Sequence, residues 1–262
     1  MTIDEIGAQE LNREARIYFH DILREARAGA LRDAEACEPL VHSIERLGAY
    51  LTSKKSNLNS YQPRLELIAE RSPLAEAIPN RWRDMHRPVQ TLFELVRHGR
   101  NSAMHDGVFA RHLTQHLVEL ALILEDSLMR DLDQVGDYMV KNPVCAALWH
   151  PISFIRQEML ASSFSYLPVA IEDGAKKSWG LVSDLAVAQY LRSAQSGQER
   201  DGRLALPLKE AVGSKALMLD EPYVCKAGDR LATALERCQR LPILVCTDSG
   251  ELSGILTAFD LL

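Results

Sequence analysis

Apolar residues in the first 130 positions recur at three- and four-residue spacing, which is the period of an amphipathic helix. Between Ile6 and Leu51 the apolar residues at this spacing include Ile17, Leu23, Leu40, Val41, Ile44, Leu47 and Leu51. The polar run TSKKSNLNS then interrupts the pattern. A middle section of short pieces is punctuated by Pro63, Pro73, Pro79 and Pro88.

Two longer helices follow, at about 89–105 and 108–130, with Gly107 placed to end the first of them. No run in residues 1–130 has the alternation of a strand. The pattern therefore predicts an all-α bundle of about five helices.

The pattern changes after residue 130. Short β-rich runs (YLPVAI, WGLVS, LPILVC and SGILT) alternate with helical segments such as ISFIRQEMLASS and RLATALERCQR. The whole chain is therefore predicted to be α+β, with a helical domain at 1–130 and an α/β domain at 131–262.

The second domain contains an internal repeat. LPVAIEDGAKKSWGLVSDL at 167–185 returns as LPILVCTDSGELSGILTAFDLL at 241–262. In each copy Leu-Pro opens a strand, a glycine-bearing turn follows, and a second strand begins at a glycine. We place the first repeat at about 134–193, a polar linker at 194–205 and the second repeat at about 206–262. A tandem repeat of this kind is stronger evidence than any single motif.

Composition limits the classes of partner and the cellular compartment that the sequence suggests. The net charge is −6, so binding of nucleic acid would need a local basic patch. Five scattered cysteines without a CxxC pair fit reduced thiols better than a disulfide framework or a zinc ribbon. The acidic N-terminal sequence is unlike a signal peptide, and no apolar run approaches the roughly 20 residues of a membrane span. We expect a cytoplasmic protein that makes no contact with a membrane.

The C-terminal repeat resembles the CBS domain pair, or Bateman module. The resemblance rests on Gly-aliphatic-aliphatic-Thr/Ser-x-x-Asp, which is complete from Gly254 to Asp260. In that family the hydroxyl and the carboxylate bind the ribose hydroxyls of an adenosine nucleotide. The resemblance implies that Thr257 and Asp260 bind AMP, ATP or a related nucleotide as a regulatory ligand. The first copy offers Ser183 as a further candidate nucleotide-binding residue, but Ala186 stands where the aspartate should be, which favours one site per chain.

The chemistry of this assignment is sound, because a carboxylate accepts charge-assisted hydrogen bonds from a cis-diol and a hydroxyl both donates and accepts. The alternative is that Thr257 and Asp260 only cap a terminal helix.

The stretch RHGRNSAMHDG at 97–107 contains Arg100-Asn101-x-x-x-His105, between the last two long helices of the first domain. This resembles the HEPN family of helical bundles, in which an Arg-x(4–6)-His motif marks metal-independent ribonucleases. The resemblance implies that Arg100, Asn101 and His105 cleave single-stranded RNA. A histidine can shuttle protons near neutral pH and an arginine can stabilise a phosphate.

On one helix, Arg100 and His105 would point about 140° apart. Because HEPN bundles and CBS pairs commonly dimerise, the two resemblances imply a symmetric homodimer that pairs two motifs.

Local charge agrees with this hypothesis. The stretch from Arg81 to His112 contains six arginines and only three carboxylates, and five of the eight histidines lie between His86 and His116. The alternative is a solvated helix face whose arginines pair with carboxylates of the bundle. Histidines 105, 112 and 116 could also suggest a metal, but no nearby cysteine or carboxylate pair completes a ligand set. We therefore expect no metal.

The sequence thus favours a nucleotide-sensing regulatory protein, in which a CBS pair controls a HEPN-like domain that is a candidate endoribonuclease. One alternative is a non-catalytic regulatory or dimerisation module that docks a protein partner. A weaker one is a structural scaffold in which both sites are vestigial.

Overall fold

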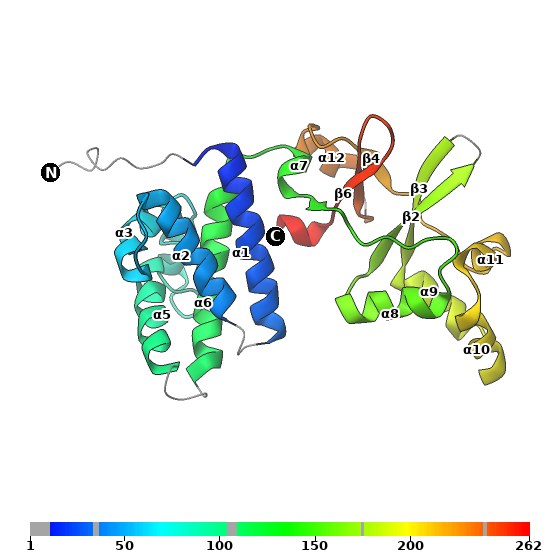
Figure 1. Cartoon of the computed structure of the whole chain (residues 1–262), viewed down its shortest axis with the longest axis horizontal. Coiled ribbons are helices and arrows are strands. Elements are labelled where there is room, and N and C mark those ends of the chain that lie inside the picture. Colours follow the sequence, from blue (N-terminus) through cyan, green and yellow to red (C-terminus); the bar gives the residue numbers. More distant parts are fainter. Residues whose placement is uncertain (1–10, 34–36, 104–108, 174–175, 238–239) are drawn as a thin grey trace. The chain divides into compact units, whose positions relative to one another are not determined.

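The computed structural model describes residues 11–33, 37–103, 109–173, 176–237 and 240–262, and the chain divides into two compact units, 1–132 and 133–262. The first unit is helical and the second mixes helices and strands, so the predicted α+β class is confirmed (Figure 1). No helix within these residues is both long and apolar enough to cross a membrane.

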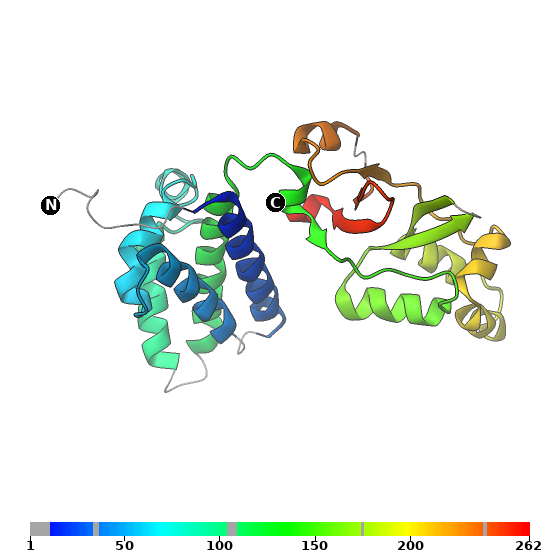
Figure 2. The same cartoon turned by 45° about the horizontal axis from the view of Figure 1, so that its top comes forward.

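The first unit is a bundle around one central helix. Its described helices are α1 (Arg13–Arg32), α2 (Glu38–Thr52), α3 (Leu58–Ala69), α4 (Ala77–Arg81), α5 (Val89–Ala103) and α6 (Phe109–Met129). Helix α6 packs most extensively against α5 and α1, which flank it in Figures 1 and 2. Its leucines 117, 120, 124 and 128 are buried at the spacing of one helix face.

A buried ion pair links α1 to α6. The Nε and Nη2 atoms of Arg27 each donate to one carboxylate oxygen of Glu125, both at 2.9 Å. Both side chains are largely buried, so losing either one would leave an unpaired charge inside the bundle.

One prediction for this unit is wrong. Pro63 does not separate short pieces but lies in the middle of α3. Its ring removes one helical hydrogen bond, but the apolar face of α3, which includes Leu58, Tyr61 and Leu65, is buried in the core. Tertiary packing therefore outweighs the local cost.

The second unit has two sheets. Its described elements are α7 (Val135–Tyr138), β1 (Val140–Lys141), α8 (Ile152–Ser162), β2 (Tyr166–Asp173), β3 (Lys176–Ser183), α9 (Asp184–Arg192), α10 (Gly197–Ala205), α11 (Leu208–Gly213), β4 (Tyr223–Cys225), α12 (Leu231–Arg237), β5 (Ile243–Cys246), β6 (Leu252–Leu256) and the 3-10 turn η2 (Ala258–Leu261). One sheet has the order β1-β6-β5-β4, and the other is the antiparallel hairpin β2-β3.

The two repeats exchange their opening segments. At the start of the first repeat, Val140 pairs antiparallel with Ile255 in β6, and Ala146 then bridges in parallel to Val169 in β2. The first repeat therefore contributes one strand to the sheet of the second.

The second repeat makes the equivalent exchange, and its opening segment pairs with the first repeat. Asp220 pairs antiparallel with Leu181 in β3, and Tyr223 then pairs in parallel with Ile243 in β5. Leu181 and Ile255 each follow the motif glycine, so the two exchanges are equivalent. Together with Leu244 these two residues form a small buried cluster that draws on both repeats.

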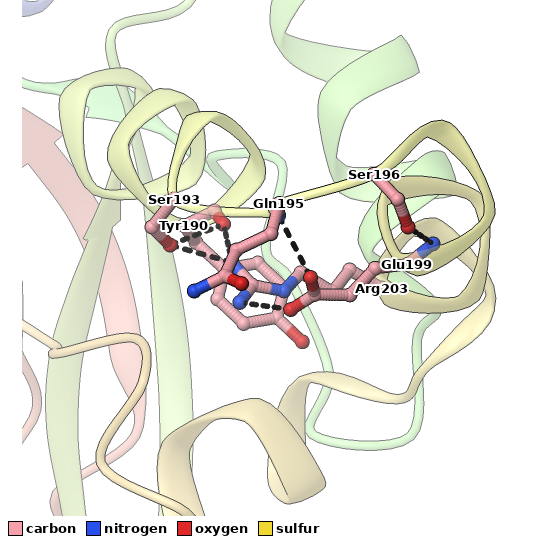
Figure 3. A network of polar contacts seen from close by, with 6 residues as sticks. All are labelled: Tyr190, Ser193, Gln195, Ser196, Glu199 and Arg203. Carbon is pink, nitrogen blue, oxygen red and sulfur yellow. Dashed lines mark hydrogen bonds and ion pairs between the residues drawn. The ribbon is translucent and has the colours of Figure 1, made fainter.

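The stretch expected to be a polar linker is helical over Gly197–Ala205. Figure 3 shows how α10 is held against the end of α9. The guanidinium of Arg203 lies over the ring of Tyr190 at 5.1 Å, donates to the Tyr190 carbonyl and the Ser193 hydroxyl, and pairs with Glu199 at 2.6 Å. These contacts satisfy a carbonyl at the C-terminal end of α9 and fix the helix that follows.

Candidate functional site

Thr257 and Asp260 meet directly after β6. The backbone N–H of Thr257 donates to Asp260 Oδ2 at 2.7 Å, and the Thr257 hydroxyl donates to the same oxygen at 2.8 Å. Thr257 stands at the N-cap of η2 and Asp260 is its third residue, which makes a capping box. The structure thus brings the two predicted residues together, and it also shows the capping arrangement of the alternative hypothesis.

Local sequence explains this placement. Ile255 and Leu256 are buried in the sheet, and the β-branched Thr257 continues the extended backbone at φ −113° and ψ 166°. The chain then turns into η2, whose first-turn carboxylate lies at the positive end of the helical turn. Both side chains remain partly exposed, so a ligand could reach them.

The equivalent position in the first repeat has a hydroxyl without the carboxylate. Ser183 is buried and caps α9, where its Oγ accepts from the Ala186 N–H at 3.2 Å. Asp184 is the first residue of α9 and is exposed. The first repeat therefore has no carboxylate where the second repeat has Asp260.

The glycine of the motif has a packing role beside the site. Lys141 of β1 lies opposite Gly254 in the antiparallel register. A Cβ on Gly254 would lie 2.5 Å from Met139 Sδ and 3.0 Å from the Val140 carbonyl oxygen. The strand exchange therefore brings residues 139–141 alongside β6, the strand that Thr257 follows. Sequence reasoning did not single out these neighbours, and the only signal was that VKNPV precedes the first copy.

The second candidate site falls at the limit of what the structure describes. The backbones of Arg100 and Asn101 lie in the last turn of α5, their side chains lie outside the description, and His105 lies outside the described residues with Gly107. The close approach of α5 and α6 nearby is evident at Gly99, where a Cβ would lie 3.1 Å from Leu113 Cδ1. The structure leaves the pairing of Arg100 with His105 untested.

One of the basic residues near this motif, Arg87, already forms an ion pair within the bundle. Arg87 donates from Nη1 to both carboxylate oxygens of Glu119, at 2.9 and 3.0 Å. Burial lowers the pKa of His116, and Arg87 and His112 lower it further against an opposing effect of Glu119. Glu119 is thus engaged by an arginine rather than available beside the two histidines. Across the described residues, no group of three or more His, Cys, Asp and Glu side chains is arranged to hold a metal ion.

Comparison with known families identifies a CBS domain in the C-terminal half. The family model for the CBS domain matches residues 214–262, which contain the whole Gly254–Asp260 motif. The match does not extend to the helical unit. No curated protein matches the chain.

Several solved structures resemble the chain. The structure of CBSX2 in complex with AMP is 23% identical, has a TM-score of 0.36, and covers 49% of this chain and 92% of its own. A CBS domain-containing protein of unknown function from Bacillus anthracis is 22% identical with a TM-score of 0.38, covering 49% and 89%. The cytosolic domain of the Mg2+ channel MgtE in complex with ATP is 15% identical with a TM-score of 0.36, covering 95% and 93%. Likenesses this distant do not bear on the function of the chain.

Proposed function

We propose that the C-terminal unit is a regulatory module that binds one adenosine nucleotide per chain at the end of β6. The observation that carries this proposal is the meeting of Thr257 and Asp260 within the segment that matches the CBS domain. Oδ2 of Asp260 already accepts two hydrogen bonds from Thr257, which orient the carboxylate. An oriented carboxylate suits a ribose cis-diol, because both hydroxyls can donate to it.

In this proposal the capping box and the binding site are the same two residues. Capping fixes the carboxylate before the ligand arrives, so little side-chain entropy is lost on binding. We infer a cytoplasmic protein in which occupancy by AMP, ATP or a related nucleotide regulates the helical unit, and in which two chains form a homodimer.

Thermal unfolding with and without AMP and ATP tests the nucleotide site. Binding to the folded state alone should stabilise it by about 2.7 kcal/mol when the nucleotide is at about 100 times its Kd. Asp260→Ala should abolish the ligand-induced rise in Tm. Asp201→Ala removes an exposed carboxylate from α10 and should leave it intact. Absence of any rise with either nucleotide at millimolar concentration would contradict the proposal.

A second candidate function is metal-independent cleavage of single-stranded RNA by Arg100, Asn101 and His105. It is favoured by the place of Arg100 and Asn101 in the last turn of α5, directly before the long helix α6. His105 would transfer protons, Arg100 would stabilise the phosphate and Asn101 would orient either group.

Cleavage assays in EDTA test this second function. The products should carry 2′,3′-cyclic phosphate ends, because the nucleophile is the 2′-hydroxyl of the substrate, and DNA should survive. His105→Ala should lower the rate by roughly 10²–10⁴-fold, while His112→Ala should cut RNA like the wild type. Activity that survives His105→Ala or disappears in EDTA would argue against it. Complete inactivity, with or without nucleotide, would favour a non-catalytic module that docks a protein partner.

A further inference from the structure

The turn between α4 and α5 exposes two large apolar side chains. Trp82, directly after α4, is 49% exposed, and Met85, three residues later, is 74% exposed. All seven residues from Arg81 to Arg87 are exposed. Large apolar side chains that lie close together in water often mark a binding surface, so this turn is a candidate for one.

Backbone hydrogen bonds hold the turn in one conformation. The N–H of Trp82 donates to the Ile78 carbonyl at 2.9 Å, and the N–H groups of Met85 and His86 donate to the Trp82 carbonyl at 3.1 and 3.0 Å. Pro79, in the helix just before the turn, is buried. The exposed indole therefore stands on an ordered backbone, and a ligand would lose little affinity to the ordering of the turn.

Two arginines flank the indole. The guanidinium of Arg81 lies over the Trp82 ring, 5.8 Å from its centre. In the part of the chain that the structure describes, neither Arg81 nor Arg83 forms an ion pair with a carboxylate, although Asp84 is on the same turn. Arg87, by contrast, is paired with a carboxylate of α6. The turn therefore offers two unpaired cations beside an aromatic ring.

The other two tryptophans of the chain lack this arrangement. Trp179 donates from Nε1 to the Gly250 carbonyl at 3.0 Å, so its polar atom is used within the second unit. Trp149 is 75% exposed, but the aromatic group that its ring contacts is that of His150, edge to face. Of the three, Trp82 is the one that combines an exposed indole with two neighbouring arginines.

We propose that this turn binds single-stranded nucleic acid, with one base stacked on the face of Trp82 that Arg81 leaves open and with Arg83 on an adjacent phosphate. Every base presents a flat π-face, so stacking on an aromatic side chain tolerates any sequence. Arginine suits a phosphate because its planar guanidinium can donate two hydrogen bonds to it. A base inside a duplex has both faces covered by its neighbours, so the surface selects single strands.

Ring and charge together favour nucleic acid over an acidic peptide. Carboxylates could pair with Arg81 and Arg83, but they would leave the open face of Trp82 in water. A nucleotide supplies a flat face and an anion at neighbouring positions of one chain. Neither contact uses a 2′-hydroxyl, so DNA binds as well as RNA, and the inference does not depend on the RNA cleavage proposed above.

Fluorescence anisotropy of a labelled oligothymidylate of about ten nucleotides, added to the full chain in EDTA and low salt, tests the proposal. Trp82→Ala should weaken binding by at least about fivefold, which is the lower end of what one stacked base contributes. Trp82→Phe keeps a flat ring and should weaken binding less. Arg83→Gln should reduce the slope of log Kd against log salt concentration by about 0.7, because one charged contact to a phosphate is lost.

Trp149→Ala and Arg200→Gln are the matched controls, since each removes the same group from an exposed position in the second unit. Both variants should bind the oligonucleotide like the wild type. The inference is overturned if the wild type does not bind, if Trp82→Ala binds as tightly as the wild type, or if a duplex of the same length or oligoglutamate competes as well as the single strand. Because the measurement is binding of DNA, these outcomes are separate from the change in Tm with AMP or ATP and from cleavage of RNA.

Discussion

Strands β3 and β6 hold equivalent places in the two repeats, and a hydroxyl residue at the end of β3 or directly after β6 caps the next turn. In the first repeat Ser183 caps a nine-residue helix and accepts from the Ala186 N–H. In the second, Thr257 caps one 3-10 turn and donates to the Asp260 carboxylate. The same fold thus supports two different chemistries. The first hydroxyl accepts a backbone hydrogen bond and nothing more, whereas the second donates to a carboxylate, which is the group that the proposed nucleotide site requires.

The largest difference in stability between the two repeats is expected when alanine replaces the glycine of each motif. Gly254→Ala would force a methyl group against Met139 and the backbone oxygen of Val140, where a Cβ lies 3.0 Å from that oxygen. A backbone oxygen in a sheet cannot move aside as a flexible side chain can, so the free energy of unfolding should fall by about 2 kcal/mol. Urea unfolding of the full chain measures this loss of stability.

Gly180→Ala is the matched control for this substitution. Its Cβ would meet only the flexible side chains of Ile171 and Leu219, at 3.2 Å and beyond. It should therefore change stability by less than about 1 kcal/mol. Equal losses for the two variants would mean that β1 does not approach β6 as closely as the structure has it.

Loss of the capping hydroxyl should also change the free energy of unfolding by different amounts in the two repeats. Ser183→Ala removes a buried cap from a full helix and should cost about 1 kcal/mol of unfolding free energy. Thr257→Ala frees only a four-residue turn and should cost a few tenths of that value, while it weakens nucleotide binding. Urea unfolding and nucleotide titration of the same two variants check both effects, and a reversed order of stability would contradict the comparison.

The stability of the second repeat should depend on pH in the alkaline range, whereas that of the first repeat should not at the equivalent position. Burial raises the pKa of the Cys225 thiol to about 11, with smaller contributions from Asp229 and Cys246. The first repeat has Leu148 at the corresponding place, which cannot titrate. Because the unfolded thiol ionises at its lower ordinary pKa, unfolding releases a proton between these two values. The stabilisation is complete below about pH 9 and is lost as pH rises through about 11.

This pH effect can be isolated by comparison with Cys225→Ala. The stability of the wild type should fall by about 1 kcal/mol more than that of the variant between pH 9 and 10, as urea unfolding at several pH values would show. A constant difference between the two proteins over this range would mean that the thiol is not shielded from water.

The repeat itself could be predicted from the sequence, because Leu-Pro, a turn and Gly-aliphatic-aliphatic-hydroxyl mark both strands in each copy. The strand exchange could not. Val140 pairs with Ile255 across more than a hundred residues, and nothing in the local pattern of either segment specifies the partner. The pairing of Thr257 with Asp260 was predictable because a three-residue spacing at the start of a turn brings the two side chains together.

The helix α10 was missed although its signals were present. Ser196 and Glu199 have the spacing of a capping box, and the Glu199 N–H donates to Ser196 Oγ at 3.1 Å. Glu199 and Arg203 then form an i, i+4 ion pair. High polarity suggested a linker, but a helix with one contact face needs few apolar residues when its ends are capped.

The smallest expected change in stability has the most direct bearing on function. Ala186→Asp gives the first repeat the carboxylate that it lacks, three residues after Ser183, as Asp260 follows Thr257. A carboxylate in the first turn of α9 should add a few tenths of a kcal/mol through capping and the helix dipole. Calorimetric titration with AMP or ATP should then show two sites per chain instead of one. Asp260→Ala in the same variant should leave only the new site. If Ala186→Asp folds normally and still binds one nucleotide, the carboxylate is not what distinguishes the two repeats. The strand exchange around β6, rather than residue 260, would then have to account for the difference.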